Sequence, residues 1–278
     1  MTALAPHVER LIDLALEEDL GLGDATSEAT IDAAARGRGR FLAKEDVVVA
    51  GTAVAARVFE RLGASCRFDV ADGGRVARGD LFGEAQGPMR ALLGAERTAL
   101  NFLQRLSGVA TLTRRSVEAL AEGGGRTRLL DTRKTTPGWR RLEKDAVRAG
   151  GGTNHRLSLG DGILVKDNHV AACGGVAEAV RRARARGNAM LRVEVEATSL
   201  DQLEEAIRAG ADIVLLDNMD DAALAEAVRR AGGRVLLEAS GTMTLERLPR
   251  VAATGVDYVS MGAITHSARA VDLSFEVA

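Results

Sequence analysis

Residues 191–218 read LRVEVEATSLDQLEEAIRAGADIVLLDN and contain two short apolar runs separated by a helical pattern. The first run ends at Glu196, the second ends at Asp217, and the helical pattern covers about residues 199–209. Strands that are buried on both faces appear as short apolar runs, and parallel strands are joined by helices. The stretch therefore predicts one strand–helix–strand unit of a parallel sheet.

The same pattern repeats through the second half of the chain. Further apolar runs end at Asp131, Lys166, Ser240 and Gly262, and further helical patterns lie at about 174–187, 221–231 and 244–253. From Glu196 onward the strand ends are about 21–23 residues apart, which is the step of a repeated β–α unit. Six strands are clear, and we expect a seventh between residues 135 and 160.

A repeated parallel unit forms either a barrel or a doubly wound sheet. Polar or charged residues end strand after strand, and barrel enzymes collect their sites from several strand ends at one face. A doubly wound sheet would instead load the few ends beside its switch point. Glycines at Gly241 and Gly262 follow the last two strands, where barrels bind phosphate. We therefore predict an α/β barrel over residues 107–266.

The first 106 residues have a more mixed pattern. Helical patterns cover about 5–19 and 52–63, strand-like runs lie around the second of these, and a long helical pattern begins near Met89. Glycine-rich turns separate several of the strand-like runs. This half therefore predicts a small α+β domain that leads through a helix into the barrel.

Composition excludes several classes of protein. The formal net charge of −2 argues against a general nucleic-acid or membrane-surface binder. The start of the chain is an amphipathic helical pattern rather than a signal peptide, and no run approaches the roughly 20 apolar residues of a membrane-spanning helix. The two cysteines, Cys66 and Cys173, form no metal-binding pair, so we expect ordinary thiols and a cytoplasmic location.

Cationic residues are concentrated between Asp131 and Arg156. The segment divides into a loop with Arg133 and Lys134, a helix from about Trp139, a glycine turn at 150–152, and a second loop with His155 and Arg156. Cations in loops at a barrel face favour a binding role. The helix interleaves its cations with acids, so we expect those cations, which are Arg140, Arg141 and Lys144, to face solvent.

The charged strand ends admit several roles. Glu196 and Asp217 could cap the following helices, accept hydrogen bonds from sugar hydroxyls or help hold a divalent metal. Lys166 suits a phosphate or carboxylate, and a Schiff-base role is a second reading. Together with the loop cations and the glycines, these residues predict a multiply anionic small ligand, such as a phosphorylated sugar beside a polycarboxylate. Arg97 reads, on sequence alone, as a surface arginine.

An ordered set of motifs resembles the quinolinate phosphoribosyltransferase family, and the resemblance covers nearly the whole chain. The motifs are AERTALNFLQRLSGVAT, DTRKTTPG, AVRAGGGTNHR, ILVKDNH, VEVE, LLDNM, LEASG and GVDYVSMGAITHSA. The resemblance implies an N-terminal α/β sandwich, comprising residues 1–106 and the C-terminal tail 267–278, beside an open TIM-like barrel. It also implies a homodimer or larger homo-oligomer in which Arg97 enters the partner's active site.

The family transfers phosphoribosyl from phosphoribosyl pyrophosphate to quinolinate with decarboxylation, and it requires Mg²⁺. The resemblance assigns the quinolinate carboxylates to Arg97, Arg133, His155, Arg156 and Lys166. It places Lys134 at the pyrophosphate or ribose, with Thr132 in the same substrate-binding loop. Glu196 and Asp217 would contact the ribose and reach the metal through pyrophosphate or water, so the implied catalytic set is Lys134, Lys166, Glu196 and Asp217. The implied 5′-phosphate cradle is Ser240, Gly241, Thr242, Gly262 and His266.

Two positions depart from the family pattern. Thr242 stands where we expect a second glycine, and Thr153 stands where the triple glycine more often continues with histidine. Three alternatives remain beside this reading. They are a paralogous phosphoribosyltransferase of the kind associated with molybdenum transport operons, an aldolase that uses Lys166 as a Schiff base, and a phosphosugar-binding module without activity.

Overall fold

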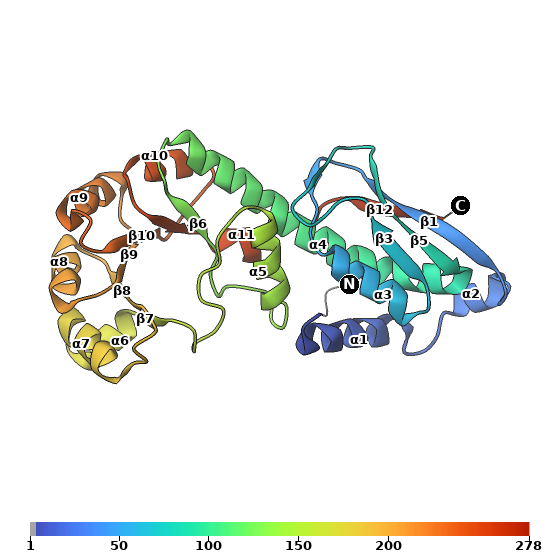
Figure 1. The fold of residues 1–278 in the computed structure, drawn as a ribbon, viewed down its shortest axis with the longest axis horizontal. Coiled ribbons are helices and arrows are strands. Elements are labelled where there is room, and N and C mark those ends of the chain that lie inside the picture. The colour runs from blue at the N-terminus through green and yellow to red at the C-terminus, as the bar shows by residue number, and fades with distance from the viewer. Residues whose placement is uncertain (1–3, 278) are drawn as a thin grey trace. The chain divides into compact units, whose positions relative to one another are not determined.

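The structure is a computed structural model that describes residues 4–277, and its contacts divide the chain into two units. The N-terminal unit contains the residues up to Arg114, residues 136–151 and the tail from Ser267. The barrel unit contains residues 115–135 and 152–266. Figure 1 shows the elements of both units. Each unit is described by itself below.

The N-terminal unit is built on a four-stranded antiparallel sheet in the order β12-β1-β5-β3. The tail reaches this sheet as its edge strand, and Phe41 of β1 lies opposite Phe275 of β12. A two-stranded ribbon pairs β2 with β4. The strands are β1 (Arg36–Ala43), β2 (Val47–Val48), β3 (Ser65–Phe68), β4 (Arg75–Val76), β5 (Leu81–Pro88) and β12 (Leu273–Val277).

Aromatic rings form the core of the N-terminal unit. The Phe41 ring lies within 4.8–5.9 Å, centroid to centroid, of the rings of Phe59, Phe68, Phe82 and Phe275. Such ring pairs add to the stabilisation from apolar burial. The helices are α1 (Pro6–Leu20), α2 (Ala25–Thr30), α3 (Thr52–Arg61), the first part of α4 (Met89–Glu122) and α5 (Arg140–Ala149).

The expected barrel boundary at residue 107 differs from the structure in two places. Helix α4 continues without a break to Glu122, and residues up to Arg114 belong to the N-terminal unit. The segment 136–151 also belongs there, because Trp139 stacks on Phe102 at 4.7 Å and Glu143 binds Arg105 at 2.7 Å.

Helix α5 corrects one expectation from its charge pattern. Arg141 is exposed, as expected, but Lys144 is only 2% exposed and lies on the buried face of the helix. Glu143, beside it, is fully buried. Alternating acids and bases therefore do not show that this helix faces solvent. Glu143, for example, is buried in an ion pair with Arg105.

The barrel unit contains six parallel strands in the order β6-β11-β10-β9-β8-β7. The sheet curves with its helices on the outer side, and β6 and β7 are its two edge strands, which do not pair with each other (Figure 1). The predicted open α/β barrel is therefore confirmed. The strands are β6 (Arg128–Leu130), β7 (Ile163–Val165), β8 (Val193–Ala197), β9 (Ile213–Asp217), β10 (Leu236–Ser240) and β11 (Tyr258–Ser260).

The helices of the barrel unit follow the predicted repeat. They are the end of α4, α6 (Asp167–Cys173), α7 (Val176–Arg186), α8 (Leu200–Ala209), α9 (Asp221–Ala231), α10 (Leu248–Ala253) and α11 (Ala263–His266). The seventh strand expected between residues 135 and 160 is wrong. Residues 135–160, all of which the structure describes, contain α5 and one parallel bridge between Leu130 and Thr153. The rest of the segment forms loops, and α5 belongs to the N-terminal unit.

Two further expectations concern the whole chain. Cys66 and Cys173 are both free thiols, and burial raises the pKa of Cys66 to about 12. Within residues 4–277 no helix has the length and apolar character needed to cross a membrane.

Candidate active site at the carboxyl ends of the barrel strands

A cavity of about 330 Å³ lies at the carboxyl ends of the barrel strands. It brings together both cationic loops that the sequence separates by a helix. The predicted site residues that line it are Thr132, Arg133, Lys134, His155, Arg156, Lys166 and Ser240. Arg97 is not among the lining residues; it belongs to the N-terminal unit, where its side chain is exposed on α4.

Arg133 and Arg156 lie close enough to repel each other. Burial, followed by the charge of Arg133, lowers the pKa of Arg156, while Glu194 and Asp161 oppose that shift. The Arg156 guanidinium donates to the Gly162 carbonyl at 2.9 Å. The buried Nε of Arg133 has no hydrogen-bond partner among the described residues. Two neighbouring guanidiniums with donors to spare form a natural site for a carboxylate.

Lys134 is held by its backbone while its side chain remains exposed. Its amide donates to Thr132 Oγ1 at 3.0 Å, and its carbonyl accepts from Thr265 Oγ1 at 2.8 Å. A Cβ atom on Gly262 would lie 3.1 Å from Lys134 Cδ and from the His266 ring. Glycine at this position therefore lets a lysine, a histidine and a backbone segment approach one another, as an anion cradle requires.

Lys166, Glu196 and Asp217 form a second charged group at the strand ends. Lys166 Nζ is 3.6 Å from Glu196 Oε2, and its side chain is 50% exposed. Burial raises the pKa of Glu196; Lys166 lowers it, and the charge of Asp217 raises it further. Asn218 donates to Asp217 at 2.8 Å. The predicted carboxylates are thus neighbours, although neither lines the cavity itself.

In the loop after β10, Gly241 has a backbone angle that favours glycine, and Thr242 does not. Gly241 has a φ of +116°, and a Cβ there would lie 2.3 Å from Asn218 Oδ1. Thr242 does not need the angles reserved for glycine, since Asn218 is the one non-glycine residue with positive φ in the described chain. Its carbonyl accepts from Arg247 at 3.2 Å. The departure at Thr242 is therefore compatible with the turn.

Asp131 is a site residue whose role the sequence does not reveal. It is fully buried at the end of β6, and its carboxylate accepts from Asn154 Nδ2 at 2.6 Å and from the His155 amide at 2.8 Å. These bonds fasten the second cationic loop to the end of β6. The recognisable signal is a short carboxylate directly after a buried strand.

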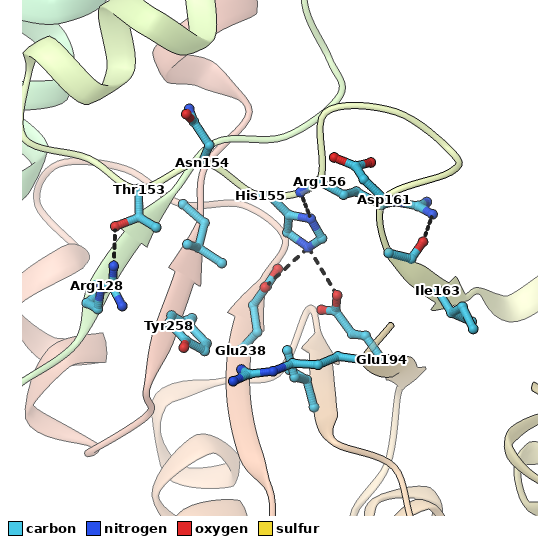
Figure 2. Close-up of a pocket in the computed structure, with 14 residues that line it drawn as sticks. Arg128, Thr153, Asn154, His155, Arg156, Asp161, Ile163, Glu194, Glu238 and Tyr258 are labelled. Carbon is cyan, nitrogen blue, oxygen red and sulfur yellow. Dashed lines mark hydrogen bonds and ion pairs between the residues drawn. The ribbon is translucent and has the colours of Figure 1, made fainter. Parts of the chain in front are cut away.

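Two further carboxylates, Glu194 and Glu238, lie inside the barrel below the cavity. They project from β8 and β10, and their side chains are 6% and 1% exposed. Figure 2 shows the His155 ring between them, with Nε2 at 3.1 Å from Glu194 and 3.6 Å from Glu238. Burial, and then the charge of Glu194, raises the pKa of Glu238 to about 8.

Comparison with known proteins finds two family models that together match most of the chain. The model for the C-terminal domain of quinolinate phosphoribosyl transferase matches residues 109–276, and the model for its N-terminal domain matches residues 24–107. A protein of Bacillus subtilis named probable nicotinate-nucleotide pyrophosphorylase (carboxylating) is 42% identical, covering 98% of this chain and 93% of its own length.

Relatives from other organisms agree. Quinolinate phosphoribosyltransferase (decarboxylating) 1 of Nicotiana glauca is 41% identical, covering 96% of this chain and 81% of its own length. The solved structure of the nicotinate-nucleotide pyrophosphorylase from Francisella tularensis superposes with a TM-score of 0.95 at 40% identity, covering 100% of this chain and 98% of that one.

Proposed function

This chain belongs to the quinolinate phosphoribosyltransferase family, and we propose that it transfers phosphoribosyl from phosphoribosyl pyrophosphate to quinolinate. The products would be nicotinate mononucleotide, pyrophosphate and carbon dioxide, as a step of NAD biosynthesis. The observation that carries this proposal is the pair of neighbouring guanidiniums, Arg133 and Arg156, in one cavity. A dianion such as quinolinate offsets their repulsion, and each guanidinium can hold a carboxylate.

The remaining site residues divide the other substrate among them. Lys134, Gly262 and His266 lie together and would bind phosphate groups of phosphoribosyl pyrophosphate. Ser240, Gly241 and Thr242 would complete the 5′-phosphate cradle with their backbone amides. Glu196 and Asp217 would accept hydrogen bonds from the ribose hydroxyls, and Lys166 would bridge the two substrates from its position beside Glu196.

Magnesium is compatible with these residues. Glu196 and Asp217 supply carboxylate oxygens at one place, and magnesium sites commonly combine one or two carboxylates with substrate phosphates and water. We propose that both carboxylates reach the ion through pyrophosphate or water. A bound Mg²⁺ would neutralise charge that develops on the departing pyrophosphate.

The geometry supports a reaction without a dedicated general base. The cationic residues would hold quinolinate so that its ring nitrogen faces the ribose C1. As the bond from C1 to pyrophosphate breaks, C1 becomes positively charged, and Glu196 and Asp217 would stabilise that charge. After the new C–N bond forms, the adjacent carboxylate leaves as carbon dioxide. The pyridinium nitrogen accepts the electron pair, and a proton then replaces the carboxylate on the ring carbon.

The aldolase alternative receives less support. A Schiff-base lysine is typically activated by desolvation, whereas the Lys166 side chain is half exposed and ion-paired with Glu196. The relatives reported above are named for the quinolinate or nicotinate-nucleotide reaction, which also weakens the molybdenum-operon reading. A binding module without activity would not need the carboxylates of Glu196 and Asp217 beside the Lys166 ammonium.

The assembly and location of the protein are further parts of the proposal. We propose a homodimer or larger homo-oligomer in which the exposed Arg97 of one chain completes the quinolinate site of another. We also propose a cytoplasmic location, in keeping with two free thiols. Neither a nucleic acid nor a membrane is needed as a partner.

The direct test is an assay with quinolinate, phosphoribosyl pyrophosphate and Mg²⁺, with detection of nicotinate mononucleotide by mass. We expect product formation that requires all three components. The same assay with nicotinate should give little product, because the second carboxylate would be missing from the cationic site. Absence of turnover with quinolinate, in a folded and magnesium-supplied protein, would refute the proposed function.

A further inference from the structure

The barrel contains a second cavity of about 210 Å³ toward the amino ends of its strands, where Arg128, Ile213 and Tyr258 line it. His155, Arg156 and Glu238 line both this cavity and the proposed substrate cavity. His155, Glu194 and Glu238, here called the buried triad, therefore lie at the floor of the proposed substrate site. The family resemblance leaves both carboxylates of the triad without a role.

Both ring nitrogens of His155 are engaged inside the protein. Nδ1 accepts the backbone N–H of Arg156 at 2.7 Å, so Nδ1 carries no proton (Figure 2). A neutral imidazole then has its proton on Nε2, which faces Glu194 at 3.1 Å and Glu238 at 3.6 Å. The imidazole thus donates to Glu194, with Glu238 beside it, and not toward the substrate cavity.

Burying the Glu194 and Glu238 carboxylates costs folding free energy, and packing alone does not explain why they are there. Oε1 of Glu194 and both oxygens of Glu238 are buried without a hydrogen-bond partner among the described residues. Leaving buried acceptors unsatisfied opposes folding, and such groups are usually found where function requires them. An apolar pair would fill the same space at the centre of the two strands without that cost.

We propose that Glu194 and Glu238 are positioning residues for quinolinate, an inference that rests on the proposed function. Glu194 accepts the Nε2–H of His155, Glu238 lies beside the same nitrogen at 3.6 Å, and His155 in turn holds the Arg156 backbone through Nδ1. Glu194 also attracts the Arg156 side chain, which Arg133 repels. The triad therefore holds Arg156 near Arg133, in place for a dianion.

The same three side chains could be read as a metal site, because their ligand atoms lie within 4.8 Å of one another. The hydrogen bond at Nδ1 argues against that reading. Coordination through Nε2 would require this nitrogen to lose its proton while Nδ1 accepts a backbone N–H. The ring would then be an imidazolate anion, whereas metal-bound histidine ordinarily donates its other ring N–H to an acceptor.

The test compares polar and apolar replacements at the two carboxylates. Glu194→Gln and Glu238→Gln keep an acceptor for the imidazole, while Glu194→Met and Glu238→Met remove it at similar volume. Glu226→Gln, at an exposed ion pair on α9, is the matched control for loss of charge. We expect the Met variants to raise KM for quinolinate roughly 10- to 100-fold, with KM for phosphoribosyl pyrophosphate nearly unchanged. The Gln variants should recover part of the loss.

A second readout does not depend on activity. In ¹⁵N-histidine NMR spectra, which contain signals from four histidines, a His155→Gln variant identifies the His155 signals. We expect the neutral Nε2–H tautomer in the wild type and in the Gln variants, and a different tautomer balance in the Met variants. If a Met variant does not fold, the Gln variants and the wild-type spectrum still decide the tautomer.

Three outcomes would overturn the inference while leaving the proposed function intact. They are an Nδ1–H tautomer of His155, an unchanged KM for quinolinate in folded Met variants, and saturable Zn²⁺ binding that shifts the His155 signals and disappears in Glu238→Gln. A wild-type protein without quinolinate turnover would instead refute the proposed function, and the NMR spectra would then still show whether the triad holds His155 as described.

Discussion

At the scale of single residues, the site is dominated by cations that have more donors than acceptors around them. Arg156 retains one carbonyl partner, at Gly162, and lies near both Arg133 and Glu194. Arg133 keeps a buried Nε without a partner among the described residues. Such unsatisfied donors are costly in the free protein. An anion bound in the proposed site would accept hydrogen bonds from these donors and so offset that cost.

Replacing Arg156 or Lys166 by alanine should therefore reduce turnover with quinolinate by roughly 100-fold or more, because each removes a charge that, in the proposed function, would position the substrate. Steady-state kinetics would measure the loss, and circular dichroism would show that the fold persists. Arg148→Ala is the matched control, since Arg148 is exposed on α5 and paired with Asp145. Near-normal rates for Arg156→Ala would remove this arginine from the proposed site.

Glu238 predicts a pH dependence of stability. Its pKa is raised from 4.5 to about 8, so the folded protein holds the proton more tightly than the unfolded chain does. The resulting stabilisation is fully present below about pH 4.5 and is lost as the pH rises through about 8.

Urea unfolding measured from about pH 5 to about pH 9 should show the wild type losing stability relative to Glu238→Gln as the pH rises. The comparison with the variant cancels the titration of groups that do not interact with Glu238. A constant difference between the two proteins across this range would mean that Glu238 has an ordinary pKa in the folded state.

At the scale of elements, the strand ends were predictable and the strand interiors were not. Each apolar run stops at a polar residue, and parallel register carries those residues to one edge of the barrel, as Ser240 opposite Asp217 illustrates. Glu194 stands two residues before Glu196 and therefore faces the same side of β8. The sequence could have revealed Glu194 as a charged residue within a buried strand. The alternation in VEVE, however, is equally typical of a half-exposed strand.

The loop after β10 gives a prediction about an element rather than about a charge. Gly241→Ala would place a Cβ 2.3 Å from Asn218 Oδ1 at a φ of +116°. We expect the loop to shift and KM for phosphoribosyl pyrophosphate to rise about tenfold or more, with a stability loss of about 1 kcal/mol.

Gly233→Ala separates strain from contact in this experiment. Gly233 also has a positive φ, of +75°, but a Cβ there would meet nothing within 4 Å. The control should therefore lose less stability than Gly241→Ala, and its kinetics should stay normal. Equal kinetics for the two variants would show that the loop does not bind the 5′-phosphate.

At the scale of the whole molecule, the chain does not divide where its patterns change. The sequence separates the two halves near residue 107, yet the N-terminal unit takes helix α5 from between two barrel strands and strand β12 from the tail. Local periodicity predicts that α5 is a helix. It does not predict that Trp139 stacks on Phe102, because that contact joins residues far apart in the sequence.

Local sequence patterns also do not reveal a role for Arg97, which is exposed on α4. If one chain's Arg97 completes the site of a partner, mixing inactive Arg97→Ala and Arg156→Ala proteins should restore activity. Each mixed dimer then has one site with both defects and one intact site. Because random mixing makes about half of the dimers mixed, activity should return to about a quarter of the wild-type value. If Arg97 acts within its own chain, no intact site forms on mixing. If Arg97 acts in no site, the Arg97→Ala protein is active before mixing. Sedimentation of the mixed sample would confirm that subunits exchange, so that a lack of recovery would count against the shared arginine.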